Sequence, residues 1–145
     1  MKPFLLIRLT ICLLPFLAAT YSSSYAQSKK VTFNTSTVEP NAEGTVKVKK
    51  DKNGNFNIDI EVDNLADPSK LIPAKKAYVV WLETQEKGAK NIGQIHTSGS
   101  MFSKAKKASM TTVSPNKPVR IFISAEDDPA TEQPGTVIVL TTNSF

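Results

Sequence analysis

Cysteine and histidine are almost missing from this 145-residue chain, which contains one of each, Cys12 and His96. With a single cysteine no disulfide can form within the chain, and neither a cysteine-based nor a multi-histidine metal site can be built. A serine–histidine–aspartate triad would have to use His96, and nothing in the sequence around it supports one. These absences favour a non-enzymatic protein that needs no metal or cofactor.

Long apolar runs are also missing, with one exception at the N-terminus. Lys2 and Arg8 precede a mostly apolar, uncharged run over residues 9–19. Small residues follow at Ser24 and Ala26, at the positions that a signal peptidase reads before its cut. The sequence therefore predicts a secretory signal peptide that is cleaved after Ala26.

The predicted signal peptide covers residues 1–26 and leaves residues 27–145 as one exported domain, in the periplasm or outside the cell. Cleavage before Cys12, as in a lipoprotein, is the competing interpretation. It is disfavoured because Ile11 is large and because the apolar run continues past the cysteine. No later stretch approaches the roughly 18 to 20 apolar residues that span a bilayer.

The charge of the predicted mature chain is modest. It keeps 16 basic and 13 acidic residues, a net charge of +3, because Lys2 and Arg8 leave with the signal peptide. So small an excess does not favour a nucleic-acid partner, which would also be unusual outside the cytoplasm. We expect the partner to be another envelope protein.

Turn residues punctuate the chain at short intervals, and the segments between them are rich in valine, isoleucine, threonine and aromatics. Gly, Pro, Asn and Asp recur roughly every 8 to 12 residues, which is typical of an all-β sandwich or barrel. We therefore predict an antiparallel, immunoglobulin-like β-sandwich of about eight strands. The expected strands cover residues 31–38, 46–49, 56–63, 77–83, 91–96, 108–113, 119–125 and 136–142.

The second and third predicted strands form a hairpin whose register follows from the alternation of apolar and polar residues. Val48 must lie opposite Ile58 if the valines and isoleucines are to share one face. Counting inward leaves a three-residue loop, 52–54. Such a loop ends on a residue in the left-handed conformation, which Gly54 tolerates.

The strand at 77–83 is apolar on both faces, so we expect it to lie in the middle of a sheet. Tyr78 belongs to one face and Trp81 to the other. Either ring could stack on a sugar or a peptide of a partner. Packing inside the protein is the favoured interpretation, because both rings lie in the middle of a strand.

An acidic loop at 126–135 begins with three carboxylates, Glu126, Asp127 and Asp128. These side chains could bind a cation, act as an acid–base pair or contact a partner protein. A solvated connecting loop is favoured over a metal or catalytic site, because the spacing matches no regular cation loop. The expected recognition surface is a sheet edge or the two long loops at 65–75 and 126–135.

Four segments follow one another at hairpin distances, and together they resemble the C-terminal extracytoplasmic domain of anti-sigma-K factors. The segments are Tyr-Val-Val-Trp-Leu-Glu at 78–83, Asn-Ile-Gly-Gln-Ile at 91–95, Ile-Ser-Ala-Glu-Asp at 123–127 and Pro-Gly-Thr-Val-Ile-Val-Leu at 134–140. The resemblance implies a β-sandwich that works outside the cytoplasm and contacts proteins. It implies no catalytic residues.

The chain departs from that family in two ways. Asp127-Asp128-Pro129 follows Glu126 where the family has Glu-Pro and then Gly-Gly. A predicted signal peptide also stands where the family has a sigma-binding segment and a transmembrane helix, so direct inhibition of a sigma factor is not implied. We therefore expect a protein-binding or envelope-signalling accessory module. The alternative is an adhesion or carbohydrate-binding module that uses Trp81 or Tyr78.

Overall fold

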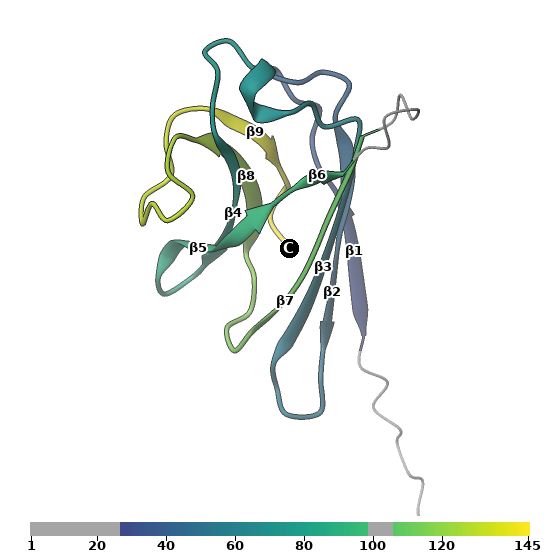
Figure 1. Ribbon diagram of the computed structural model, residues 1–145. Coiled ribbons are helices and arrows are strands. Elements are labelled where there is room, and N and C mark those ends of the chain that lie inside the picture. Colours follow the sequence, from purple (N-terminus) through teal and green to yellow (C-terminus); the bar gives the residue numbers. More distant parts are fainter. Residues whose placement is uncertain (1–26, 99–105) are drawn as a thin grey trace, which may run out of the picture.

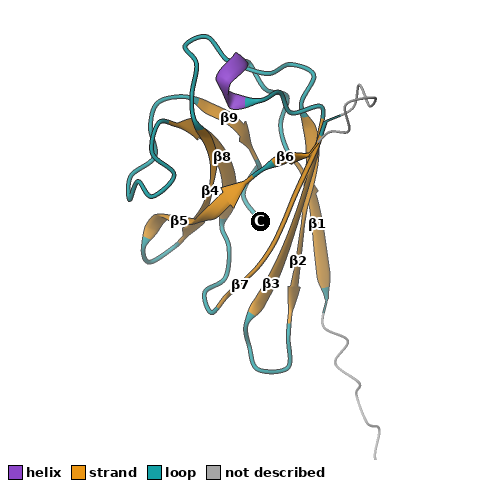
Figure 2. Ribbon diagram, viewed as in Figure 1, coloured by secondary structure: helices purple, strands orange, loops and turns teal. Residues whose placement is uncertain are grey.

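The computed structural model describes residues 27–98 and 106–145 (Figure 1). The predicted signal peptide, Cys12 included, and the connection at 99–105 lie outside the described residues. The described chain forms β-strands and one short 3-10 turn, as Figure 2 shows, so the predicted all-β class is confirmed. Within these ranges no helix has the length and apolar character needed to cross a membrane.

The strands form two antiparallel sheets that pack face to face, as in a β-sandwich. The five-stranded sheet has the order β1-β2-β3-β7-β6, and the four-stranded sheet has the order β5-β4-β8-β9. The strands of the first sheet are β1 (Ser28–Thr32), β2 (Glu43–Lys50), β3 (Phe56–Asp63), β7 (Lys107–Ser114) and β6 (Thr97–Ser98). Those of the second are β5 (Gly88–Ile95), β4 (Ala77–Thr84), β8 (Arg120–Glu126) and β9 (Ile138–Thr141).

The β2–β3 hairpin has the predicted register. Val48 pairs with Ile58, and Lys50 pairs with Phe56. The backbone amide of Asp51 donates to the carbonyl of Asn55 at 2.8 Å, which leaves the expected three-residue loop. Gly54 ends that loop with φ 87°, in the left-handed region that favours glycine.

Strand β4 is central in its sheet, as its two apolar faces predict, and pairs with β5 and β8. Tyr78 and Val80 belong to the main core between the two sheets. Val79 and Trp81 point to the opposite side of β4 and form a separate buried cluster with Phe122. The described residues thus form two apolar clusters, one between the sheets and one outside the four-stranded sheet.

Four predicted strands have a boundary that is wrong by two or more residues, among them β2, which begins at Glu43 rather than at residue 46. The first strand is Ser28–Thr32 rather than 31–38, because Ser36 Oγ accepts the amides of Val38 and Glu39 at 3.2 and 2.8 Å and turns the chain there. Strand β5 begins at Gly88 rather than at residue 91. The last strand, predicted at 136–142, is confined to Ile138–Thr141.

Candidate protein-binding end

The two long loops that were predicted as a recognition surface meet at one end of the sandwich. They are the β3–β4 loop (64–76) and the β8–β9 loop (127–137). Lys75 Nζ lies 2.7 Å from Asp127 Oδ2. The amide of Lys76 donates to the carbonyl of Glu126 at 2.9 Å. The β3–β4 loop projects beyond the strands at the top of Figure 1, near the β1–β2 loop (33–42), whereas the β8–β9 loop starts at this end and runs along the outer side of the four-stranded sheet. We call these three loops the loop end.

The β3–β4 loop is held by its own hydrogen bonds. Asp67 caps the 3-10 turn η1 (Pro68–Lys70) by accepting from the backbone amide and the hydroxyl of Ser69, at 3.0 and 2.6 Å. The Ser69 hydroxyl, followed by its amide, lowers the pKa of the Asp67 carboxyl, since both hydrogen bonds favour the charged form. The amide of Lys75 donates to the carbonyl of Pro68 at 2.9 Å and closes the loop.

Ile72 lies at the tip of this closed loop and is 99% exposed. Its neighbour Leu71 is only 6% exposed and packs into the main core. The backbone beside Ile72 is therefore anchored from within, while the Ile72 side chain has no protein contact that shields it from water. The loop holds an apolar side chain in solvent in a defined position.

The β8–β9 loop covers the outer side of the four-stranded sheet. Asn91 Nδ2 on β5 donates to the carbonyls of Pro129 and Thr131 at 3.0 and 2.9 Å, and so joins the loop to the sheet. Beneath it the Trp81 and Phe122 rings lie side by side, with centroids 6.1 Å apart and planes within 14°. Trp81 is fully buried although it lies outside the main core.

A chain of hydrogen bonds connects the buried tryptophan to the covering loop. Trp81 Nε1 donates to Ser124 Oγ at 2.7 Å, and Ser124 Oγ in turn donates to Glu126 Oε1. The amide of Gly135 donates to the same carboxylate oxygen at 2.8 Å. Glu126 is 8% exposed, so its carboxylate is a structural acceptor that fastens the loop.

The structure separates the five residues that the sequence singled out as candidate contacts. Trp81 is 0% and Tyr78 1% exposed, which confirms the packing interpretation for both and leaves neither ring a surface for stacking. Glu126 is buried under the β8–β9 loop. Asp127 and Asp128 alone face solvent; Asp127 pairs with Lys75, and Asp128 Oδ1 accepts the amide of Ala130 at 2.9 Å.

The hydroxyl of Tyr78 is unusual, because it is buried and has no hydrogen-bond partner among the described residues. Burial, followed by the nearby carboxylates of Glu39 and Asp67, raises the pKa of this phenol. His96, the one histidine, is exposed. Across residues 27–98 and 106–145 no group of three or more acidic, histidine or cysteine side chains is placed to hold a metal ion.

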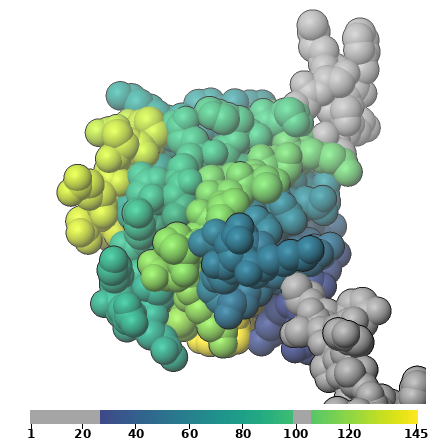
Figure 3. Space-filling model, turned by 90° about the horizontal axis from the view of Figure 1, so that it is seen from below, coloured from purple at the N-terminus to yellow at the C-terminus, as the bar shows by residue number. Residues whose placement is uncertain are grey.

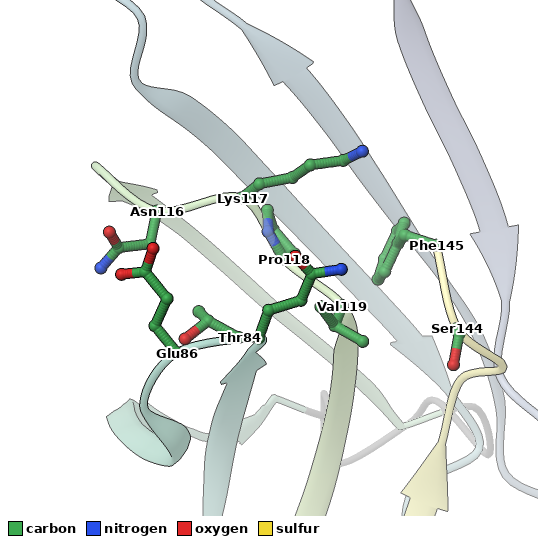
Figure 4. A pocket seen from close by; sticks show the side chains of 9 residues that line it. Thr84, Glu86, Asn116, Lys117, Pro118, Val119, Ser144 and Phe145 are labelled. Atoms are coloured by element: carbon green, nitrogen blue, oxygen red, sulfur yellow. The ribbon is translucent and has the colours of Figure 1, made fainter.

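A cavity of about 320 Å³ lies at the opposite end, between the β4–β5 turn and the β7–β8 loop. Figure 3 views this end and shows the two segments, teal and green, next to one another. In Figure 4, Glu86 and Asn116 lie on one side of the cavity, with Ser144 and Phe145 on the other. The charged side chains that line it, Glu86 and Lys117, are both exposed to solvent. The cavity therefore holds neither of these charged groups away from water.

Sequence reasoning missed Ile72 and the contact between the two loops. The apolar pair Leu71-Ile72 before Pro73, in a loop with several lysines, was the only signal for the exposed tip. The ion pair between Lys75 and Asp127 joins residues 52 positions apart, and no local pattern predicts it. Comparison with family models, curated proteins and solved structures found no match to this chain.

Proposed function

We propose that this chain is a non-enzymatic, exported binding domain that contacts another envelope protein through its loop end. The observation that carries the proposal is Ile72, an almost completely exposed apolar side chain on a loop held by hydrogen bonds. Single exposed apolar residues are common on protein surfaces. Ile72 differs because its loop is closed at Pro68 and anchored at Leu71, so binding orders little additional chain.

The strand order supports an immunoglobulin-like arrangement. The order β2-β3-β7-β6 corresponds to strands A, B, E and D of that fold, and β5-β4-β8-β9 corresponds to C′, C, F and G, with β1 added at the edge. On this correspondence the β3–β4 and β8–β9 loops occupy the B–C and F–G positions. Those loops lie at the binding end of antibody variable domains. The analogy concerns location, and the chemistry rests on the side chains.

The charges of the loop end favour a protein over an anionic polymer or a lipid surface. Lys70 and Lys76 are exposed there, but so are Asp128 and Glu132 on the neighbouring loop. A surface of mixed sign is typical of protein interfaces, whereas anionic polymers and membranes select clustered lysines. The resemblance to the anti-sigma-K extracytoplasmic domain agrees with an envelope signalling role.

The carbohydrate-binding alternative loses its proposed residues, because Trp81 and Tyr78 are buried. Large apolar side chains that are exposed among the described residues are Val38, Ile72 and Val113, and none of these is aromatic. Sugar-binding surfaces depend on exposed aromatic faces. A protein partner is therefore the better match.

Site-specific crosslinking tests the proposal. A photoreactive amino acid is placed next to Ile72 in the exported chain, and crosslinked proteins are quantified from intact cells that carry either Ile72 or Ile72→Asp. We expect one dominant adduct, which the aspartate reduces about tenfold, the effect of losing roughly 1.4 kcal/mol of binding energy. Val113→Asp, at a 56% exposed valine on the five-stranded sheet, is the matched control and should leave the adduct unchanged. Equal yields from all three chains would contradict the proposal.

A further inference from the structure

A groove of about 730 Å³ runs across the loop end, between the β1–β2 loop and the β3–β4 loop. Leu65 lies beneath it and is fully buried, so the groups that an occupant can reach are mostly polar and charged. Ile72 lies on the same loop but outside the lining, which makes the groove a second feature of this end.

The two walls of the groove carry opposite charges. Glu39 and Glu43 lie on the β1–β2 side, whereas Lys70, at the end of η1, and Lys106, just before β7, supply positive charge. The three ion pairs within the described chain involve none of these side chains. The groove therefore presents acidic and basic groups that an occupant can neutralise.

Two carboxamides also line the groove, those of Asn41 and Asn64. Neither side chain makes a hydrogen bond to another described residue within the geometric limits of a normal bond. A carboxamide offers a donor and an acceptor at once, which is the complement of a peptide unit. Opposite charges together with two exposed carboxamides are groups that an extended peptide can contact.

We propose that this groove binds an extended segment of the partner protein, with a basic side chain against Glu39 and Glu43 and an acidic group against Lys70. This assignment rests on the proposed function of the loop end and names the chemistry of the partner. An anionic phospholipid headgroup would meet two carboxylates on the β1–β2 wall, and this repulsion disfavours a membrane surface.

Titration of the isotope-labelled mature chain with synthetic peptides tests the inference by NMR. The probe peptide is Lys-Thr-Leu-Thr-Glu with blocked ends, and the controls are Gln-Thr-Leu-Thr-Gln and Glu-Thr-Leu-Thr-Glu. We expect the probe to shift the amide signals of Asn41, Asn64 and Lys70. Both controls should bind at least about tenfold more weakly, because the diglutamine peptide loses both charge-assisted contacts and the diglutamate peptide places a carboxylate against Glu39 and Glu43.

A charge exchange provides the matched variant. The double substitution Glu39→Lys and Glu43→Lys changes two side chains that lie outside the main core and should leave the spectrum well dispersed. It should abolish binding of the probe and favour the diglutamate peptide instead. Loss of both peptides, or shifts that map away from the groove, would overturn the inference.

Ile72→Asp separates this inference from the proposed function. Because Ile72 lies outside the groove lining, the variant should bind the probe peptide as the unmodified chain does. If no peptide binds while Ile72→Asp still reduces the crosslinked adduct, the groove assignment is wrong and the proposed function stands. If the probe binds the groove while Ile72→Asp leaves the adduct intact, the anchoring role of Ile72 is wrong.

Discussion

The two sheets turn very different outer faces away from the core that they share. On the four-stranded sheet this face carries Val79, Trp81 and Phe122, and the β8–β9 loop covers it. On the five-stranded sheet it carries charged and hydroxyl side chains, such as Lys47 opposite Asp59, which are exposed. One face is a second small core, whereas the other is a solvated surface.

The difference explains why the β8–β9 loop lies over the outer face of the four-stranded sheet. A sheet face that carries tryptophan and phenylalanine must be shielded, since burying such rings is worth about 1.5–3 kcal/mol each. The covering loop is held at both ends. Asp127, at its start, pairs with Lys75, and the amide of Gly135, near its end, donates to the Glu126 carboxylate. The buried aromatic face therefore positions one of the loops of the proposed binding end.

Trp81→Ala should produce the largest effect on stability. The substitution empties the centre of the covered face and breaks the hydrogen bond to Ser124, so we expect a loss of about 3–5 kcal/mol in the free energy of unfolding. Chemical denaturation measures it. Lys47→Ala, in the middle of the open face, is the control and should stay within about 0.5 kcal/mol. Similar losses for both variants would remove the distinction between the two faces.

Glu126→Ala should have the next largest effect, because it removes the acceptor shared by Ser124 and Gly135. We expect a loss of about 1–3 kcal/mol in the free energy of unfolding. Faster hydrogen exchange at the Gly135 amide should accompany it. Asp127→Ala removes only an ion pair whose carboxylate is 65% exposed, and it should cost no more than about 1 kcal/mol. Unchanged exchange at Gly135 in the Glu126 variant would show that the carboxylate does not fasten the loop.

Tyr78→Phe compares the inner face of β4, which packs into the main core, with the outer face that carries Trp81. The Tyr78 hydroxyl is buried and has no partner within the described chain, so its removal should raise the free energy of unfolding by about 1 kcal/mol. Trp81→Phe should do the opposite, because it deletes a donor that is satisfied. Thermal unfolding of the two variants measures the contrast. A loss of stability in Tyr78→Phe would mean that its hydroxyl has a partner after all, such as a buried water.

Asp59→Ala should have the smallest effect. Asp59 lies opposite Lys47 and accepts the Thr111 hydroxyl at 3.0 Å, but both contacts are on the exposed face. Exposed pairs contribute about 0.2–1 kcal/mol, so we expect a loss near the lower limit, measured by chemical denaturation. A loss comparable to that of Glu126→Ala would show that the open face is shielded by something else.

Much of the fold could be predicted from local alternation. The pairing of Val48 with Ile58 and the left-handed Gly54 follow from pleat parity within one hairpin. The central position of β4 follows from its two apolar faces. The first strand was misplaced, because residues 31–38 have strand-forming side chains but Ser36 turns the backbone. The candidate site was only partly predictable: both loops were identified, whereas Ile72 was not.

The sequence by itself determined which residues alternate, where the turns fall and that two half-apolar sheets must cover one another. Only the tertiary structure decided that the β8–β9 loop shields Trp81 and that Lys75 meets Asp127. The reason is physical. Alternation acts between neighbours in a strand, whereas Trp81 and Ser124 are 43 positions apart and meet only once both sheets have formed. Exposure, the property that distinguishes Ile72 from Leu71, is likewise decided by packing.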